Sequence, residues 1–253
     1  MLKFKKTAYS VRVLICNSKR GGNVVRYVVS DLHGEFELFV SMLDKIRFSK
    51  NDVLYVLGDI IDKGNESVRL LAYISECDNI KCIIGNHELA FLKQYHALLE
   101  SLTGDDEKIL QKLKSYFQDG HLLSWELVDY VDALPSYIEE DDFICVHAGI
   151  PLDSDKKLIP LADAEVEQLV HDRRFKSPEL VHLSSKCVFF GHTQTDVIAG
   201  ESKILGYPRD RTVPPKSIKD FYKIHMDTGT WSNGVLGCFC IDTLKAFYVK
   251  KKK

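Results

Sequence analysis

The sequence lacks a paired cysteine motif and lacks any long apolar run. Its seven cysteines form no Cys-x-x-Cys pair, and an odd number cannot all pair within one chain, which argues against a zinc knuckle and a full disulfide framework. No apolar run approaches the roughly 20 residues that a membrane-spanning helix needs. These absences exclude a disulfide-stapled scaffold and a membrane-spanning bundle. They favour a reducing, cytoplasmic setting.

Neither sign of charge is in excess. The 253 residues include 34 Lys or Arg and 36 Asp or Glu, for a net charge of -2. This balance predicts no general attraction to nucleic acid or to an acidic membrane. With 45% hydrophobic residues, the chain has the composition of an ordinary globular protein, and its length suits one large domain or two small ones.

Both ends of the chain are basic. The first 26 residues contain seven Lys or Arg and no acid, and their apolar stretch Val13–Cys16 is too short for the core of a signal peptide. We therefore predict that residues 1–23 form a basic arm or an extra edge strand. Residues 24–249 are expected to form the globular domain, and residues 250–253 a solvated basic tail.

Segments typical of strands and helices alternate in the first half of the chain. The β-branched and apolar runs that predict strands are Val24–Ser30, Asp52–Leu57 and Ile80–Ile84. Segments with the apolar spacing of a helix follow each of them, over residues 35–46, 67–76 and 87–99. Three strand–loop–helix units in succession predict a parallel α/β core.

The second half of the chain has a different pattern. Residues 104–131 are more polar and predict a helical insertion. Short strands with few helices between them are then expected at Phe143–Val146, Lys186–Phe190, Lys203–Leu205, Tyr222–Met226, Gly234–Ile241 and Lys245–Val249. The proline-containing segment Tyr207–Lys219 predicts a basic loop. Two halves that each need a partner layer indicate two packed sheets with helices outside.

Polar side chains of the kind that bind metals follow five predicted strands. They are Asp31 with His33, Asp59 with Asp62, Asn86 with His87, His147, and His192. Ligands of α/β proteins gather at the carboxyl ends of strands, and these oxygen and nitrogen donors suit Mn²⁺, Fe²⁺ or Zn²⁺. One such residue alone is more often a helix cap or an ordinary surface residue. Five sets in equivalent places favour a two-metal centre, which can clamp a phosphoryl group.

The ordered motifs resemble the signature of the metallo-dependent phosphoprotein phosphatases, in their bacterial and phage serine/threonine phosphatase branch. The motifs are Ser30-Asp-Leu-His-Gly34, Gly58-Asp-Ile-Ile-Asp-Lys-Gly64, Gly85-Asn-His-Glu88, His147-Ala-Gly149 and Gly191-His-Thr193. The match runs from about Val24 to Gly229. The resemblance implies an α/β fold, a calcineurin-like four-layer α/β/β/α sandwich of two mixed sheets with a helical insertion.

The resemblance also implies roles for individual residues. Six side chains would hold two divalent cations, most simply Mn²⁺, with Fe, Zn or Ni as alternatives. Asp31, His33 and Asp59 would hold the first cation, and Asp59, Asn86, His147 and His192 the second. His87 would be the general acid, oriented by Asp62, and a metal-bridging hydroxide would be the nucleophile.

The predicted phosphate-binding residues depart from the family pattern. Lys63 stands where the family has Arg, so the charge is kept and the bidentate fork is lost. The segment His171-Asp-Arg173 is similar to the family's Trp-x-Arg, which makes Arg173 the second candidate beside Lys63 and Asn86, with Arg174 as the fallback. Ser30 replaces the glycine of the first motif and requires an ordinary backbone angle there.

Three functions are compatible with these residues. The first is hydrolysis of phosphomonoesters, with phosphoserine or phosphothreonine in proteins, or a small phosphoester, as substrate. The alternative is hydrolysis of dinucleoside polyphosphates such as diadenosine tetraphosphate, and the third is a non-catalytic binding module. The tetraphosphatases look similar but usually carry Asp in place of Glu88 and lack Asp62, which favours the first function. The basic loop is a candidate rim for acidic substrates, with an ordinary solvated loop as the alternative.

Overall fold

The computed structural model describes residues 24–100, 107–108, 111, 123–181 and 184–251. The predicted arm at residues 1–23 and much of the predicted insertion at residues 104–131 lie outside this part of the chain. None of the helices within the described ranges combines the length and apolar character that crossing a membrane requires.

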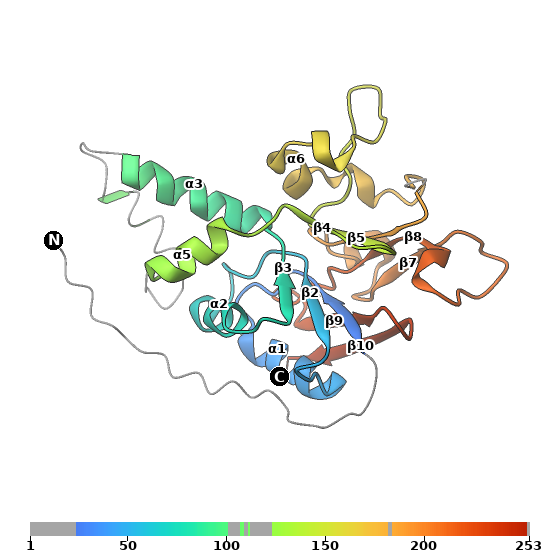
Figure 1. Cartoon of the computed structure of the whole chain (residues 1–253), viewed down its shortest axis with the longest axis horizontal. Helices are drawn as coiled ribbons and strands as arrows, with labels where there is room; N and C mark the ends of the chain where they lie inside the picture. The colour runs from blue at the N-terminus through green and yellow to red at the C-terminus, as the bar shows by residue number, and fades with distance from the viewer. Residues whose placement is uncertain (1–23, 101–106, 109–110, 112–122, 182–183, 252–253) are drawn as a thin grey trace.

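A first mixed sheet contains the three strands predicted in the first half of the chain (Figure 1). Its strands are β1 (Arg26–Val29), β2 (Val53–Val56), β3 (Ile80–Cys82), β9 (Val235–Cys240) and β10 (Lys245–Lys250), in the order β10-β9-β1-β2-β3. β1, β2 and β3 are parallel, and β9 and β10 extend the sheet in antiparallel fashion. The parallel strands therefore bring three of the predicted ligand segments to one edge of the sheet.

A second mixed sheet carries the remaining ligand segments. Its strands are β4 (Tyr137–Glu139), β5 (Phe143–Val146), β6 (Cys187–Phe190), β7 (Leu205–Pro208) and β8 (Phe221–His225), in the order β4-β5-β6-β8-β7. β5, β6 and β8 are parallel, and the antiparallel strands β4 and β7 form the edges.

Three buried clusters hold four layers together. Successive side chains of a strand point to opposite faces of its sheet, so Val28 packs between the two sheets while Val29 faces the helices of the first sheet. In β5, Phe143 likewise faces the first sheet and Ile144 faces the outer layer of the second. The central strands β1, β2, β5, β6 and β9 are buried on both faces, which explains why they are continuous apolar runs in the sequence.

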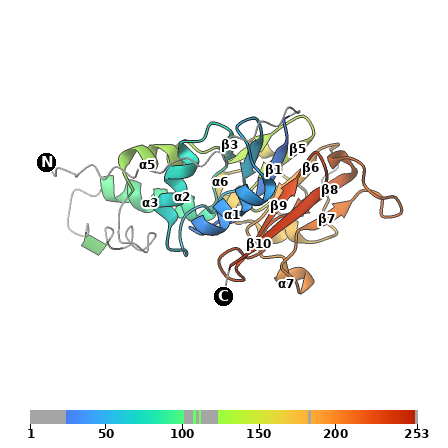
Figure 2. The ribbon, with the colours of Figure 1, turned by 90° about the horizontal axis from the view of Figure 1, so that it is seen from below.

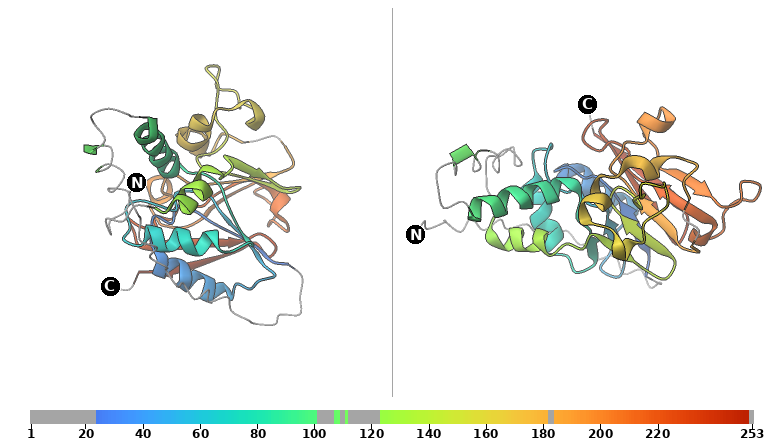
Figure 3. Two further views of the ribbon diagram at one scale, coloured as in Figure 1. Left: turned by 60° about the vertical axis from the view of Figure 1, so that its left-hand side comes forward. Right: turned by 90° about the horizontal axis from the view of Figure 1, so that it is seen from above.

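Helices cover the outer faces of the two sheets. The first sheet packs against α1 (Phe36–Ile46), α2 (Ser67–Ser75), α3 (Asn86–Glu100) and α5 (Trp125–Asp132), and the second against α6 (Val166–His171) and the 3₁₀ turn η2 (Arg173–Lys176). Figure 2 shows α3 and α5 at one end of the molecule and β7 and β8 at the other. Figure 3 shows α1 and α2 on one side of the sheets and α6 on the other. The predicted four-layer sandwich is confirmed.

Three local predictions differ from the structure. The strand predicted at Lys203–Leu205 is instead β7, which includes Tyr207 and Pro208 from the predicted basic loop. An edge strand tolerates Pro208 because the outer side of β7 needs no backbone donor. The edge strand β4 was not predicted, because three residues are too few to show a periodic pattern.

The C-terminal tail also begins later than predicted. Lys250 pairs with Val235 inside the β9–β10 ladder. The Nζ atom of Lys251 lies 2.9 Å from both carboxylate oxygens of Glu35. Both residues, predicted to be solvated tail, therefore belong to the folded domain. The six cysteines within the described residues are all buried, and Cys238 and Cys240 pack in the core.

Candidate metal centre

The predicted ligands follow the carboxyl ends of β1, β2, β3, β5 and β6, where the strand backbone turns sharply. Nine non-glycine residues of the described chain have a positive φ, and six of them are candidate site residues: Asp31, His33, Asp59, Asp62, Lys63 and His192. Such angles are uncommon, and they persist where surrounding contacts hold them. Backbone strain is thus concentrated at the residues predicted to bind metal or act in catalysis. Ser30 is absent from this group, so its backbone angle is the ordinary one that the substitution requires.

Asp59 lies between two groups of histidines. One of its carboxylate oxygens, Oδ2, lies 3.6 Å from His33 Nε2, and the other, Oδ1, lies 3.5 Å from His147 Nε2. Potential ligand atoms of His33, Asp59 and His87 lie within 4.8 Å of one another, and so do those of Asp59, His147 and His192. The carboxylate is therefore placed to be shared by two cations, as the resemblance implies.

Three donor atoms converge on one point beside Asp59. His147 Nε2 lies 3.0 Å from Asn86 Oδ1 and 3.2 Å from His192 Nδ1. The other ring nitrogen of His147 lies 2.6 Å from the carbonyl oxygen of Leu57. A proton on that nitrogen leaves the lone pair of Nε2 directed at Asn86 and His192, which is the arrangement that a metal ligand requires.

Asp31 lies against the same cluster from the first sheet. Its carboxylate accepts the backbone N–H of His192 at 3.1 Å and the hydroxyl of Ser30. A Cβ atom at residue 191 would collide with Asp31 and Ser30, so the glycine of the Gly191-His-Thr193 motif allows the two sheets to approach. Asp31 is thereby fixed between β1 and the loop that follows β6.

The electrostatics of this cluster favour bound cations. Burial, and then repulsion by Asp31, raise the pKa of Asp59 well above its ordinary value. Burial lowers the pKa of His192 to about 2, with the charges of His147 and Arg173 acting in the same direction, and burial with Lys63 lowers the pKa of His33. Buried carboxylates that lie close together repel one another, and neutral imidazoles do not offset their charge. A bound divalent ion offsets this charge and accepts the lone pairs of the imidazoles. The donor set fits two such ions.

His87 and Asp62 form a pair beside this cluster. His87 Nδ1 lies 2.6 Å from Asp62 Oδ2, and His87 Nε2 lies 3.8 Å from Asp59 Oδ2. Burial opposes the charge on His87, but the hydrogen bond to Asp62 and the attraction of Asp59 outweigh it, so the pKa of His87 is raised. The contacts of His87 thus favour its protonated form and leave Nε2 turned toward Asp59, an arrangement that suits a general acid.

Glu88 has a role in the structure that the sequence alone did not indicate. Its fully buried carboxylate accepts the backbone N–H groups of Asp59, Ile60 and Ile61 at 2.8, 2.8 and 3.0 Å, and that of Gly85 at 2.9 Å. It therefore fixes the loop that carries Asp59 against the loop that carries Asn86. The only signal in the sequence was its place in the third motif.

We expect Glu88→Gln to weaken this junction. The amide nitrogen of Gln would face backbone donors that now reach a carboxylate oxygen, with an expected loss of about 2–4 kcal/mol in the free energy of unfolding. Urea unfolding measures the loss, with Glu100→Gln at the exposed end of the same helix as the control. Equal stabilities of the two variants would contradict this role.

The two arginines predicted as alternatives for phosphate binding point to different places. Arg173 Nη1 lies 3.3 Å from Thr193 Oγ1, directly after His192. Arg174 instead binds Asp172 and the carbonyl of Leu152 on the outer side. This placement favours Arg173. Lys63 Nζ lies 2.9 Å from His33 Nε2, within the predicted site.

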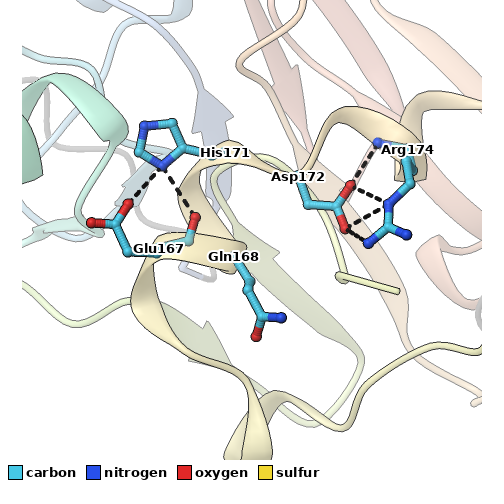
Figure 4. A pocket seen from close by; sticks show the side chains of 5 residues that line it. All are labelled: Glu167, Gln168, His171, Asp172 and Arg174. Atoms are coloured by element: carbon cyan, nitrogen blue, oxygen red, sulfur yellow. Dashed lines mark hydrogen bonds and ion pairs between the residues drawn. The ribbon is translucent and has the colours of Figure 1, made fainter. Parts of the chain in front are cut away.

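A shallow hollow of about 430 Å³ lies beside α6 (Figure 4). His171 and Glu167 line one side, and Asp172 with Arg174 lines the other. The His171 ring centroid lies 6.3 Å from that of His192. His171, which stands where the family has Trp, therefore lies between the hollow and His192.

Other polar residues near the site or away from it are not candidate metal ligands. Asp227 is buried near Asp31 and Asp59, which together with desolvation raises its pKa, and it accepts the N–H of Gly229 at 2.9 Å. His225 is a buried core residue stacked on Phe190, and His96 lies at the surface, whereas His121 and His182 fall outside the described residues. In the basic loop, Arg209 donates to the carbonyls of Lys219 and Ser184, so its guanidinium holds the loop together.

Comparisons with known proteins show the family to which the chain belongs. A model of the calcineurin-like phosphoesterase family matches residues 26–224. A symmetrical bis(5'-nucleosyl)-tetraphosphatase of Vibrio vulnificus is 30% identical over 157 residues, which cover 60% of this chain and 55% of that protein. One of Haemophilus ducreyi is 32% identical over 154 residues, covering 59% and 54%. The chain spans about half the length of these curated relatives.

Solved structures share the fold at low sequence identity. A putative diadenosine tetraphosphatase superposes with a TM-score of 0.65 at 16% identity, covering 91% of this chain and 95% of the other. A serine/threonine phosphatase of Saccharomyces cerevisiae gives 0.51 at 15% identity, covering 92% and 82%. At such identities the likeness concerns the fold alone.

Proposed function

Because this chain belongs to the calcineurin-like phosphoesterase family, we propose that it is a metal-dependent phosphoesterase that hydrolyses phosphoserine or phosphothreonine in proteins. The observation that carries the choice of substrate is the contact of 2.6 Å between His87 and Asp62. A serine or threonine alkoxide is a poor leaving group and needs a proton as it departs. A nucleoside diphosphate leaves as a stable anion and depends far less on an acid.

The residues of the site have three proposed roles: metal binding, proton donation and positioning of the loops. Asp31, His33, Asp59, Asn86, His147 and His192 would hold two divalent cations, Mn²⁺ being our proposal. When bound, these ions supply Lewis-acid activation of the phosphoryl group and of water. His87 holds a proton on Nε2 for the departing oxygen, and Asp62 keeps the ring oriented and charged. Glu88 fixes the two loops on which these residues lie.

Binding of the phosphoryl group falls to the cationic side chains at the rim. Arg173 supplies a planar fork for two phosphoryl oxygens, and Lys63 supplies a point charge. Asn86 supplies an amide beside His147. The six cysteines of the described residues are free and buried, which is compatible with our further proposal of a cytoplasmic enzyme. Its phosphoesterase domain would comprise residues 24–251.

The second candidate is hydrolysis of dinucleoside tetraphosphates. The names of the similar curated proteins support this activity better than they support a protein phosphatase. Asp62 and Glu88 favour the phosphatase, since Asp62 pairs with the proposed general acid His87 and Glu88 completes the third motif of that branch. The two activities differ in their products, because one releases inorganic phosphate and the other releases nucleotides.

Phosphate release from a phosphoserine peptide tests the first proposal. The purified protein with Mn²⁺ should release inorganic phosphate at a rate that saturates with peptide and is abolished by a chelator. Absence of release with Mn²⁺, Ni²⁺, Fe²⁺ and Zn²⁺ alike would contradict it.

We expect Lys63→Arg to raise activity. An arginine restores the second hydrogen bond to the phosphoryl group, and a charged hydrogen bond contributes about 1–3 kcal/mol. The corresponding gain in kcat/KM on p-nitrophenyl phosphate is about tenfold. A fall in kcat/KM would show that the site is built around the amine beside His33.

A further inference from the structure

Lys223 is a buried lysine in the middle of β8. Its side chain has no exposed surface. The Nζ atom donates to the carbonyl oxygens of Phe175 and Ser177, both at 2.7 Å, and of Leu180 at 2.5 Å. The rings of Phe175, Phe190 and Tyr207 surround the ammonium group with centroids at 4.6, 5.8 and 5.0 Å. Three backbone acceptors that no strand or regular helix satisfies thus converge on one side chain.

Burying an ammonium group is unfavourable, and three carbonyl partners offset the loss of hydration only if their geometry is fixed. Burial lowers the pKa of Lys223 to about 8, so the charged form with three N–H donors still predominates at neutral pH. The lysine and the segment from residue 175 to residue 180 therefore hold one another in a single arrangement.

This segment directly follows the turn that carries the candidate phosphate-binding residue. Arg173 is the first residue of η2, two positions before the first carbonyl that Lys223 binds. The Phe175 ring packs on Phe190, and a Cβ at residue 149 would lie 2.5 Å from Phe175 Cβ. The turn thus packs against the His147-Ala-Gly149 motif on one side, and Lys223 binds its backbone on the other.

We propose that Lys223 is the positioning residue for Arg173, fixing the turn from inside the second sheet so that the guanidinium meets the substrate's phosphoryl group. The proposal rests on the function proposed above for Arg173. Lys223 itself, being fully buried, touches no substrate. Its loss should therefore weaken phosphate binding rather than remove a chemical step.

Steady-state kinetics on p-nitrophenyl phosphate with Mn²⁺ test the proposal. We expect Lys223→Met to raise KM about fivefold with kcat within about twofold, and to raise the inhibition constant of inorganic phosphate by the same factor. In an Arg173→Ala background, Lys223→Met should change neither constant further, since the group it positions is gone. Lys245→Met, on the exposed side of β10, is the matched control and should leave both constants unchanged.

Other outcomes separate the possible failures. A folded Lys223→Met protein with unchanged KM and phosphate inhibition overturns the proposal, as does an equal rise of KM in both backgrounds. If Lys223→Met does not fold, Lys223→Gln, which is too short to reach three carbonyls, must show the same rise in KM and the same dependence on Arg173. If the wild type is active but Arg173→Ala leaves KM unchanged, the role of Arg173 is refuted instead.

Discussion

His87→Asn should abolish most of the activity on phosphoserine peptides while sparing part of the activity on p-nitrophenyl phosphate. General acid catalysis contributes about 10²–10⁴ in rate, so kcat/KM on the peptide should fall about a thousandfold. Nitrophenolate leaves without a proton, so the loss on the aryl ester should be about a hundredfold smaller. The difference between the two substrates, rather than either loss alone, identifies an acid.

Asp62→Asn provides the matched variant. Its amide keeps the size of the side chain but no longer supports the charge on His87, 2.6 Å away. We expect the same preference for the better leaving group with a smaller overall loss, because His87 remains present. Equal losses on both substrates in both variants would indicate that His87 and Asp62 only shape the site.

Asp59→Asn is expected to have the second large effect. The two oxygens of Asp59 face His33 and His147 on opposite sides. An Asn side chain is neutral and has only one oxygen, so it cannot bind a cation on each side. Activity on p-nitrophenyl phosphate should fall by about 10³ or more. Metal analysis after dialysis should show that the variant retains less Mn²⁺ than the wild type.

Stability distinguishes this effect from misfolding. Repulsion by Asp31 and burial both disfavour the charge on Asp59, so the metal-free variant should unfold at the same temperature as the metal-free wild type, or above it. Added Mn²⁺ should raise the unfolding temperature of the wild type more than that of the variant. Full retention of Mn²⁺ by Asp59→Asn would refute the bridging role.

The fold, and the polar side chains that gather around Asp59, could be predicted from the sequence because both depend on local signals. β1, β2 and β3 are apolar runs that end in polar residues, and parallel strands bring their carboxyl ends to one edge of a sheet. His147 and His192 come from the second sheet. No local pattern predicts that they lie near Asp59. That prediction came from the order of the motifs along the chain.

Features that depend on distant contacts were not predictable in this way. Glu88 binds backbone groups 27–29 residues earlier in the chain, and Lys223 binds carbonyls 43–48 residues earlier. A buried lysine looks like any other lysine until its neighbours are known. Arg173 and Arg174 are adjacent and alike, and only the direction of the turn places the first beside Thr193 and the second beside Asp172.

The most direct test of the proposed function compares two substrates in one preparation. Initial rates are measured with Mn²⁺ for phosphate release from a phosphoserine peptide and for nucleotide release from diadenosine tetraphosphate. The acid pair formed by His87 and Asp62 predicts that kcat/KM is at least about tenfold higher for the peptide. Faster release of adenosine diphosphate, with little phosphate from the peptide, would contradict the phosphatase assignment and establish the tetraphosphatase activity instead.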